Sequence, residues 1–77
     1  MQVRIMIFGQ LTDIVNTSAL TLTDIVDTNG LVNELNKLYP ALAGSNYIMA
    51  VNKQTVVGNT ILKENSTIAL LPPFSGG

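Results

Sequence analysis

The chain has 77 residues, enough for one domain at most. A chain of this length buries only roughly 60% of the surface that it exposes when unfolded, so its stability is marginal. It contains no cysteine and no histidine. Disulfides, metal sites held by Cys or His, Ser–His–Asp triads and thiolate nucleophiles are therefore excluded. Five acidic and four basic side chains remain. These are few ionisable groups for an enzyme that carries out catalysis without a partner.

The charge pattern argues against nucleic acid and membrane partners. The net charge is −1, whereas nucleic-acid binding needs a clustered basic face. Polar residues interrupt every apolar run before it reaches the ~20 residues of a membrane span. No basic segment followed by an apolar one marks a signal peptide, so we expect a cytoplasmic protein. Asp24 and Asp27 are too few ligands for a metal, and we expect no metal and no cofactor on this chain.

The first third of the chain predicts a β-hairpin. Residues 2–8 alternate, with Val3, Ile5 and Ile7 on one face of a strand. Residues 11–15 are short and ambiguous, and could form one helical turn. Residues 19–23 predict a second strand that pairs with the first through a long loop.

A single long helix follows. Asp27 and Thr28 can accept hydrogen bonds from the free N–H groups of a first helical turn. Pro40 should end the helix at or just before Tyr39. The apolar residues recur at helical spacing and predict one buried stripe: Leu31, Val32, Leu35, Leu38, Tyr39 and Leu42.

The second half predicts three more strands, over residues 47–51, 55–57 and 67–71. The order β-β-α-β-β-β indicates an α+β roll, with a mixed sheet packed on one main helix. The first and last strands could then pair in parallel at the centre of the sheet. We expect one folded domain over residues 1–71 and an extended tail over residues 72–77.

Both faces of the first and last strands are apolar. If these strands are neighbours, Met6, Phe8, Ala69 and Leu71 form a patch on the face away from the helix. Such a patch usually marks a protein interface. The alternative is that a loop covers it.

The C-terminal tail, Pro72-Pro73-Phe74-Ser75-Gly76-Gly77, has features with one physical use. Glycines lack a Cβ, so a Gly-Gly end can thread a narrow channel and present its carboxylate to a reactant in another protein. The two prolines stiffen the base of the tail and reduce the entropy lost on insertion. The alternatives are a frayed terminus and a cloning scar.

The sequence resembles the small subunits of molybdopterin synthase, the MoaD type, among the β-grasp sulfur carriers related to ubiquitin. The resemblance covers the whole chain, and the Pro-Pro-x-Ser-Gly-Gly ending is its specific part. The matching segments are Ile5-Met6-Ile7-Phe8-Gly9-Gln10-Leu11, the helix over residues 28–39, Ala50-Val51-Asn52, and Leu70-Leu71-Pro72-Pro73-Phe74-Ser75-Gly76-Gly77.

This resemblance implies a β-grasp fold and a reactive C-terminus. An ATP-using activating enzyme of the ubiquitin-activating type would adenylate Gly77, which would then become a thiocarboxylate. The tail residues Pro72, Pro73, Phe74, Ser75 and Gly76 would thread into the large subunit of a synthase heterotetramer, where sulfur passes to cyclic pyranopterin monophosphate. The patch of Phe8, Met6, Leu71 and Ala69 would dock both partners.

Two other functions remain open. A ubiquitin-like modifier would be joined through Gly77 to lysines of other proteins. A carrier for thiazole or cysteine synthesis would differ only in its sulfur acceptor, and Pro72-Pro73 favours the molybdenum pathway because thiazole carriers usually lack that pair.

Overall fold

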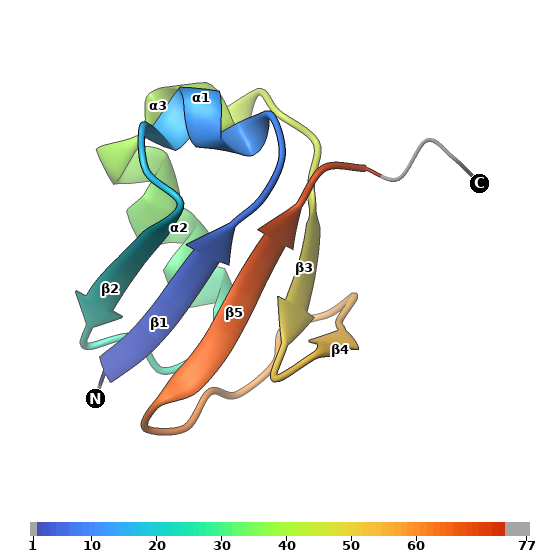
Figure 1. Ribbon diagram of the computed structural model, residues 1–77. Helices are drawn as coiled ribbons and strands as arrows, with labels where there is room; N and C mark the ends of the chain where they lie inside the picture. The colour runs from blue at the N-terminus through green and yellow to red at the C-terminus, as the bar shows by residue number, and fades with distance from the viewer. Residues whose placement is uncertain (1, 74–77) are drawn as a thin grey trace.

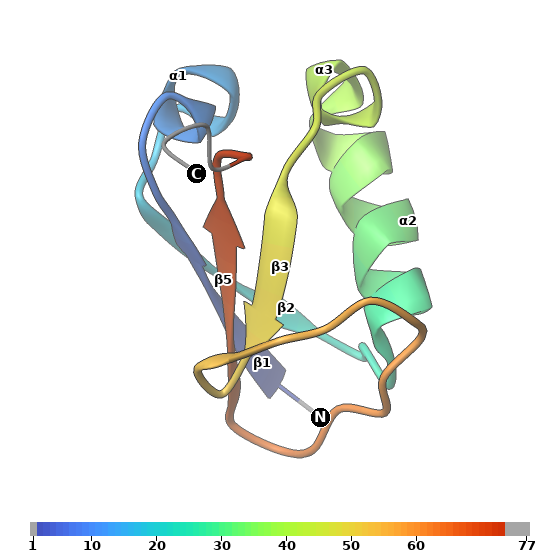
Figure 2. The same cartoon turned by 90° about the vertical axis from the view of Figure 1, so that its right-hand side faces the viewer.

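The structure, a computed structural model, describes residues 2–73 and shows a five-stranded sheet wrapped around one main helix (Figure 1). Helix α2 stands on one side of the sheet, and the other side is open (Figure 2). The elements in chain order are β1 (Gln2–Ile7), α1 (Leu11–Val15), β2 (Ala19–Thr23), α2 (Thr28–Leu38), α3 (Pro40–Ala43), β3 (Ile48–Val51), β4 (Gln54–Thr55) and β5 (Ser66–Leu71). The predicted α+β roll is confirmed.

The first and last strands meet at the centre of the sheet. The strand order is β2-β1-β5-β3-β4, with β1 and β5 parallel and every other neighbouring pair antiparallel. Met6 pairs with Ala69 and Ile7 with Leu70. The parallel pairing expected from the sequence is therefore confirmed.

The core lies between the inner face of the sheet and α2. Successive side chains of a strand point to opposite faces, so every second side chain of the central strands points toward α2. On this inner face and on α2 the following side chains are at most 2% exposed: Val3, Ile5, Ile7, Ile68, Leu70, Leu31 and Leu35. This is the apolar stripe that the alternation and the helical spacing predict.

The start of α2 is fixed by two side chains from distant parts of the sequence. One carboxylate oxygen of Asp27 accepts a hydrogen bond from the Gly30 N–H at 2.8 Å, and the other accepts from Asn59 Nδ2 at 3.1 Å. Asn59 Oδ1 in turn accepts from the Asn29 N–H at 2.8 Å. These bonds satisfy N–H groups that have no partner within the helix. The predicted cap is confirmed, and Asn59 adds a second one from a loop.

The region after α2 departs from the expected single helix. Pro40 does end α2, but it also begins the short helix α3, because its fixed φ suits a first helical turn. Leu42, expected in the stripe of the main helix, is buried through α3 instead. Leu38 is 48% exposed, so its expected place in the buried stripe was wrong.

The hairpin between β3 and β4 also differs in its boundaries. Asn52 and Lys53 both have positive φ, 50° and 73°, which makes a tight loop of the type that suits twisted strands. Strand β4 therefore begins at Gln54 and ends at Thr55, earlier than the expected residues 55–57. Val57 leaves the sheet and is 96% exposed. Strands β1, β3 and β5 differ from the expected limits by one residue at one end.

We predict that Asp27→Ala lowers the melting temperature by a few degrees, because Gly30 N–H and Asn59 Nδ2 both lose their acceptor. Asp27→Asn is the matched control, since its amide oxygen still accepts from Gly30 but carries no charge. Circular dichroism melts of the three proteins measure this. Equal melting temperatures for wild type and Asp27→Ala would contradict the role of the cap.

The same cap predicts a pH effect. The hydrogen bond from the Gly30 N–H, and then that from Asn59, hold the pKa of Asp27 below its ordinary value of 3.8. A depressed pKa stabilises the folded protein at pH above the unfolded value and loses that contribution as pH falls through the folded value. The stability of wild type relative to Asp27→Asn should therefore be constant near neutral pH and fall below about pH 4. A constant difference down to pH 2 would contradict the assignment.

Candidate functional site: an apolar sheet face beside the tail

The open face of the sheet carries an apolar patch at its centre. Met6 and Ala69 are paired neighbours in β1 and β5, and Leu71 follows on the same face of β5. Phe8, just beyond β1, is 44% exposed, and its N–H donates to the Leu70 carbonyl oxygen at 3.0 Å. The structure thus brings together all four residues that the sequence placed in one patch. Their role in docking a partner stays a prediction.

Strand β3 widens this patch with residues that the sequence analysis did not include. Ile48 pairs with Leu71, and Ala50 pairs with Ala69, so both lie on the open face. Ile48 is half-buried, and Ala50 is 7% exposed because its neighbours on this face cover it. We call the set Met6, Phe8, Ile48, Ala50, Ala69 and Leu71 the open-face patch. The register between β3 and β5 decides which residues of β3 join it, and a shift of one residue would have selected the opposite set.

The open face is poor in charge. Among the strand residues that share this face, Arg4 is the charged one, paired with Thr67 in β5 and Thr21 in β2. The other strand residues on this face are Gln2, threonines, alanines and larger apolar side chains. A partner that covers the patch would therefore desolvate little charge, which is a condition for a stable apolar interface.

The tail leaves the sheet directly at the open-face patch. Strand β5 ends at Leu71, the residue before the predicted tail, and Leu71 is itself part of the patch. Pro72 is half-buried and Pro73 is exposed. Phe74, Ser75, Gly76 and Gly77 lie outside the described residues, so their predicted roles in threading and sulfur transfer stay predictions. Figure 1 shows β5 leading out beyond the start of β3.

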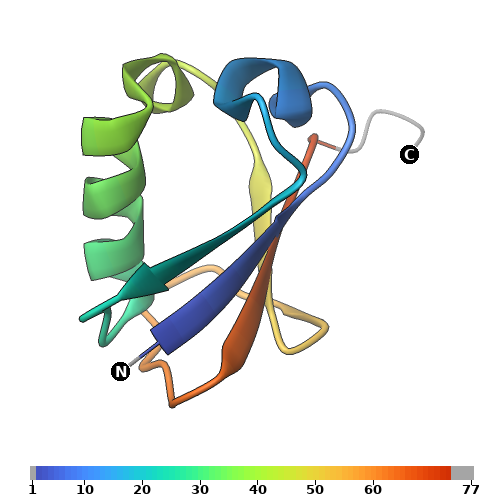
Figure 3. The ribbon, with the colours of Figure 1, turned by 60° about the vertical axis from the view of Figure 1, so that its left-hand side comes forward.

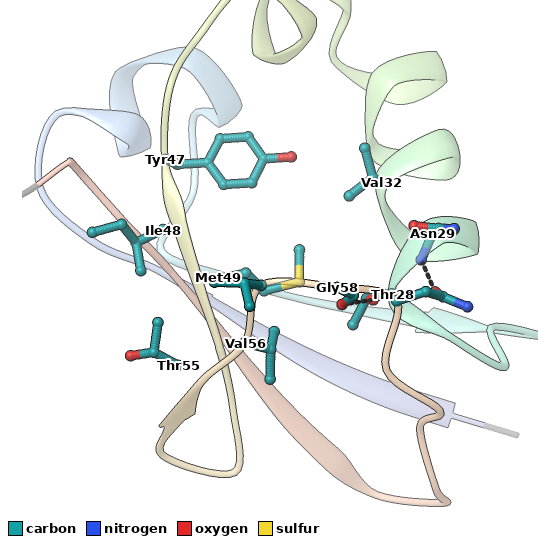
Figure 4. Close-up of a pocket in the computed structure, with 11 residues that line it drawn as sticks. Thr28, Asn29, Val32, Tyr47, Ile48, Met49, Thr55, Val56 and Gly58 are labelled. Atoms are coloured by element: carbon teal, nitrogen blue, oxygen red, sulfur yellow. Dashed lines mark hydrogen bonds between the residues drawn. The ribbon is translucent and has the colours of Figure 1, made fainter.

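A groove lies between the β3–β4 hairpin and the start of α2, and it shares Ile48 with the open-face patch (Figure 4). Its volume is about 480 Å³. It is lined by Thr28, Asn29, Val32, Tyr47, Ile48, Met49, Thr55, Val56, Val57, Gly58 and Asn59. Partial burial raises the pKa of the Tyr47 hydroxyl, which keeps it protonated at neutral pH. The lining has no acid or base that ionises near neutrality, so this groove offers no general acid–base chemistry.

Over residues 2–73, no group of three or more Asp, Glu, His or Cys side chains is placed to hold a metal ion. Asp27 acts as a helix cap, in agreement with the structural role expected for it. Of the helices in the described part of the chain, none has the length and apolar character needed to cross a bilayer.

Comparison with known proteins agrees with this architecture. Residues 5–77 match the model of the ThiS family. A solved complex of subunits 1 and 2 of molybdopterin-converting factor from Helicobacter pylori contains a chain 26% identical to this one, with full coverage of both chains and a TM-score of 0.76.

Two archaeal structures are also similar. Small archaeal modifier protein 1 from Methanosarcina acetivorans is 24% identical, with 99% of this chain and 96% of that chain covered and a TM-score of 0.83. A protein from Pyrococcus furiosus assigned as molybdopterin converting factor subunit 1 is 16% identical, with coverage of 95% and 98% and a TM-score of 0.85. The chain therefore belongs to the ThiS family, and its fold is the β-grasp of the MoaD-type ubiquitin-like sulfur carriers.

Proposed function

We propose that this chain carries sulfur on the carboxylate of Gly77 and donates it to cyclic pyranopterin monophosphate during molybdopterin synthesis. The observation that carries the proposal is the position of the tail: it begins directly after Leu71, the last residue of β5 and a member of the open-face patch. A protein that covers the patch is thereby brought next to the base of the tail. Binding of a partner to the patch would therefore also bring the C-terminus of this chain to that partner.

The chemistry needs no side chain of this protein. The terminal carboxylate attacks the α-phosphate of ATP on an activating enzyme, and pyrophosphate leaves. A sulfur donor at the oxidation level of hydrosulfide then attacks the acyl carbon, AMP leaves with one carboxylate oxygen, and a proton is released. The resulting thiocarboxylate is ionised at neutral pH and nucleophilic. Burial of the tail in the partner would position this group and keep water from hydrolysing it.

The proposed partners follow from the same geometry. The Helicobacter pylori relative is solved in a complex of subunits 1 and 2, which supports a large-subunit partner for this chain. The acid–base groups would belong to that subunit, because this chain has no histidine or cysteine. The activating enzyme would use the same open-face patch, so the two partners would bind in turn.

A second candidate is protein modification. The Methanosarcina acetivorans relative is described as a modifier protein and is nearly as similar in sequence as the subunit from Helicobacter pylori. In that case Gly77 would form an isopeptide bond with a lysine of a target. A carrier for thiazole or cysteine synthesis would share the activation steps and differ in the acceptor. The pair Pro72-Pro73 favours the molybdenum pathway among these.

We predict that the intact chain, isolated from cells that contain its activating enzyme, shows an oxygen-to-sulfur mass change located at Gly77 by fragmentation. A chain that ends at Ser75 is the control and should show no change. Absence of the thiocarboxylate from the full chain would contradict the carrier function. Isopeptide-linked conjugates in the same extract, without transfer of sulfur to the pterin, would favour the modifier.

We also predict that Phe8→Ser weakens binding to the large subunit about 30-fold or more. Loss of an aromatic side chain from the centre of an interface costs about 2 kcal/mol or more, which is about 30-fold in Kd. Because Phe8 is 44% exposed in the free protein, the melting temperature of the Phe8→Ser protein should differ little from that of wild type. Calorimetric titration measures the affinity.

Val57→Ser is the matched control for Phe8→Ser. It removes an apolar side chain that is 96% exposed, outside the open-face patch. Its affinity for the large subunit should equal that of wild type. Equal weakening by both substitutions, or none by Phe8→Ser, would contradict the placement of the interface.

A further inference from the structure

Gly9 lies in the loop between β1 and α1, and the base of the tail packs directly against it. Figure 3 shows this loop passing beside the end of β5. A Cβ built on Gly9 would lie 2.5 Å from Pro72 Cγ and 3.3 Å from Pro72 Cδ. Real Cβ atoms are essentially never this close to a neighbour, so any side chain at this position would force one of the two segments to move.

The positive φ of Gly9, +62°, does not by itself explain the glycine. Five residues with side chains adopt positive φ elsewhere in the described chain: Asn16, Asp24, Asn52, Lys53 and Asn65. Asparagine and aspartate tolerate this conformation well. What distinguishes Gly9 from these positions is the ring of Pro72 against its α-carbon.

The loop is the better anchored of the two segments. The Gly9 carbonyl oxygen accepts hydrogen bonds from Thr12 N–H at 3.1 Å and from Thr12 Oγ1 at 2.8 Å. On its other side, Phe8 N–H is bonded to the Leu70 carbonyl oxygen at 3.0 Å. Pro72 lies beyond the last ladder pair, Ile48 with Leu71, and has no N–H to donate. A side chain at residue 9 would therefore displace Pro72 rather than the loop.

We propose that Gly9 is a positioning residue that sets the direction in which the tail leaves the domain. The proposal rests on the function proposed above, in which the tail is delivered to a partner docked on the open-face patch. The ring of Pro72 moves with its backbone, and the φ of Pro73 is fixed as well, so a displacement at Pro72 is passed to the next residue. Five residues follow Pro72 and span up to roughly 17 Å when a partner holds them extended, so a small rotation at the base would then shift the terminal carboxylate by several ångströms.

The test is a double-substitution cycle on activation by the ATP-dependent activating enzyme, measured as pyrophosphate release. Gly9→Ala should lower kcat by on the order of tenfold to a hundredfold, as expected for a misplaced reacting group. KM should stay within about twofold, because the patch is unchanged and contributes the docking. In the Pro72→Ala background the ring carbons Cγ and Cδ are gone, so Gly9→Ala should have less than about a twofold effect on kcat.

Asn65→Ala is the matched control for backbone strain. Asn65 has φ of 63°, close to that of Gly9, and lies at the opposite end of β5 from the tail. Asn65→Ala should lower the melting temperature as Gly9→Ala does, since both substitutions place alanine at positive φ. It should leave kcat unchanged. Nuclear magnetic resonance supplies a readout that does not depend on activity: the Pro72 ring signals should shift in Gly9→Ala and not in Asn65→Ala.

Each outcome decides a different claim. Wild-type kcat in Gly9→Ala, unchanged Pro72 signals, or an equal loss in the Pro72→Ala background would overturn the role of Gly9 while leaving sulfur carriage intact. A wild-type chain that its activating enzyme cannot adenylate would overturn the proposed function itself, and the role of Gly9 with it.

Discussion

The parallel pairing of β1 with β5 at the centre of the sheet is the interaction on which the rest of the structure depends. It joins the first and last strands of the chain and buries Ile5 and Ile68 against α2. Because the strands are parallel, they finish at the same end of the sheet, where β1 continues into Phe8 and Gly9 and β5 continues into the tail. This pairing places the core on one face of the sheet and the open-face patch on the other. It also makes the tail leave the sheet at the edge of that patch.

This arrangement separates recognition from chemistry. The folded body supplies an apolar surface with little charge, and the proposed reacting group is a backbone terminus outside it. Under the proposed function, a composition without histidine or cysteine has a physical reason, because the body would need only to fold, dock and aim the tail. The contact between Gly9 and Pro72 is the point where the body and the tail meet, and it is built from the residue without a side chain and the residue with the stiffest backbone.

Much of this could be predicted from the sequence, since strict alternation and helical spacing report directly on buried faces. The central strands and the first four residues of the patch were found in this way, and the Asp27 cap was predicted from its short hydrogen-bond-accepting side chain before the helix. The rest depended on tertiary context. A proline can end one helix and begin the next, which moved Leu42 to α3. The contribution of Ile48 required the register between β3 and β5, and the fit of Gly9 against Pro72 required the spatial meeting of two segments far apart in the chain.

The central claim is that the carboxyl terminus of this chain, rather than any side chain, is its reacting group. The most direct measurement removes the codons for Gly76 and Gly77 from the gene in its own organism and determines the cellular content of molybdopterin and of its cyclic precursor. The account predicts loss of molybdopterin and accumulation of the precursor, with the truncated chain still folded and still present. Molybdopterin at the wild-type level in cells that make only the truncated chain would contradict it.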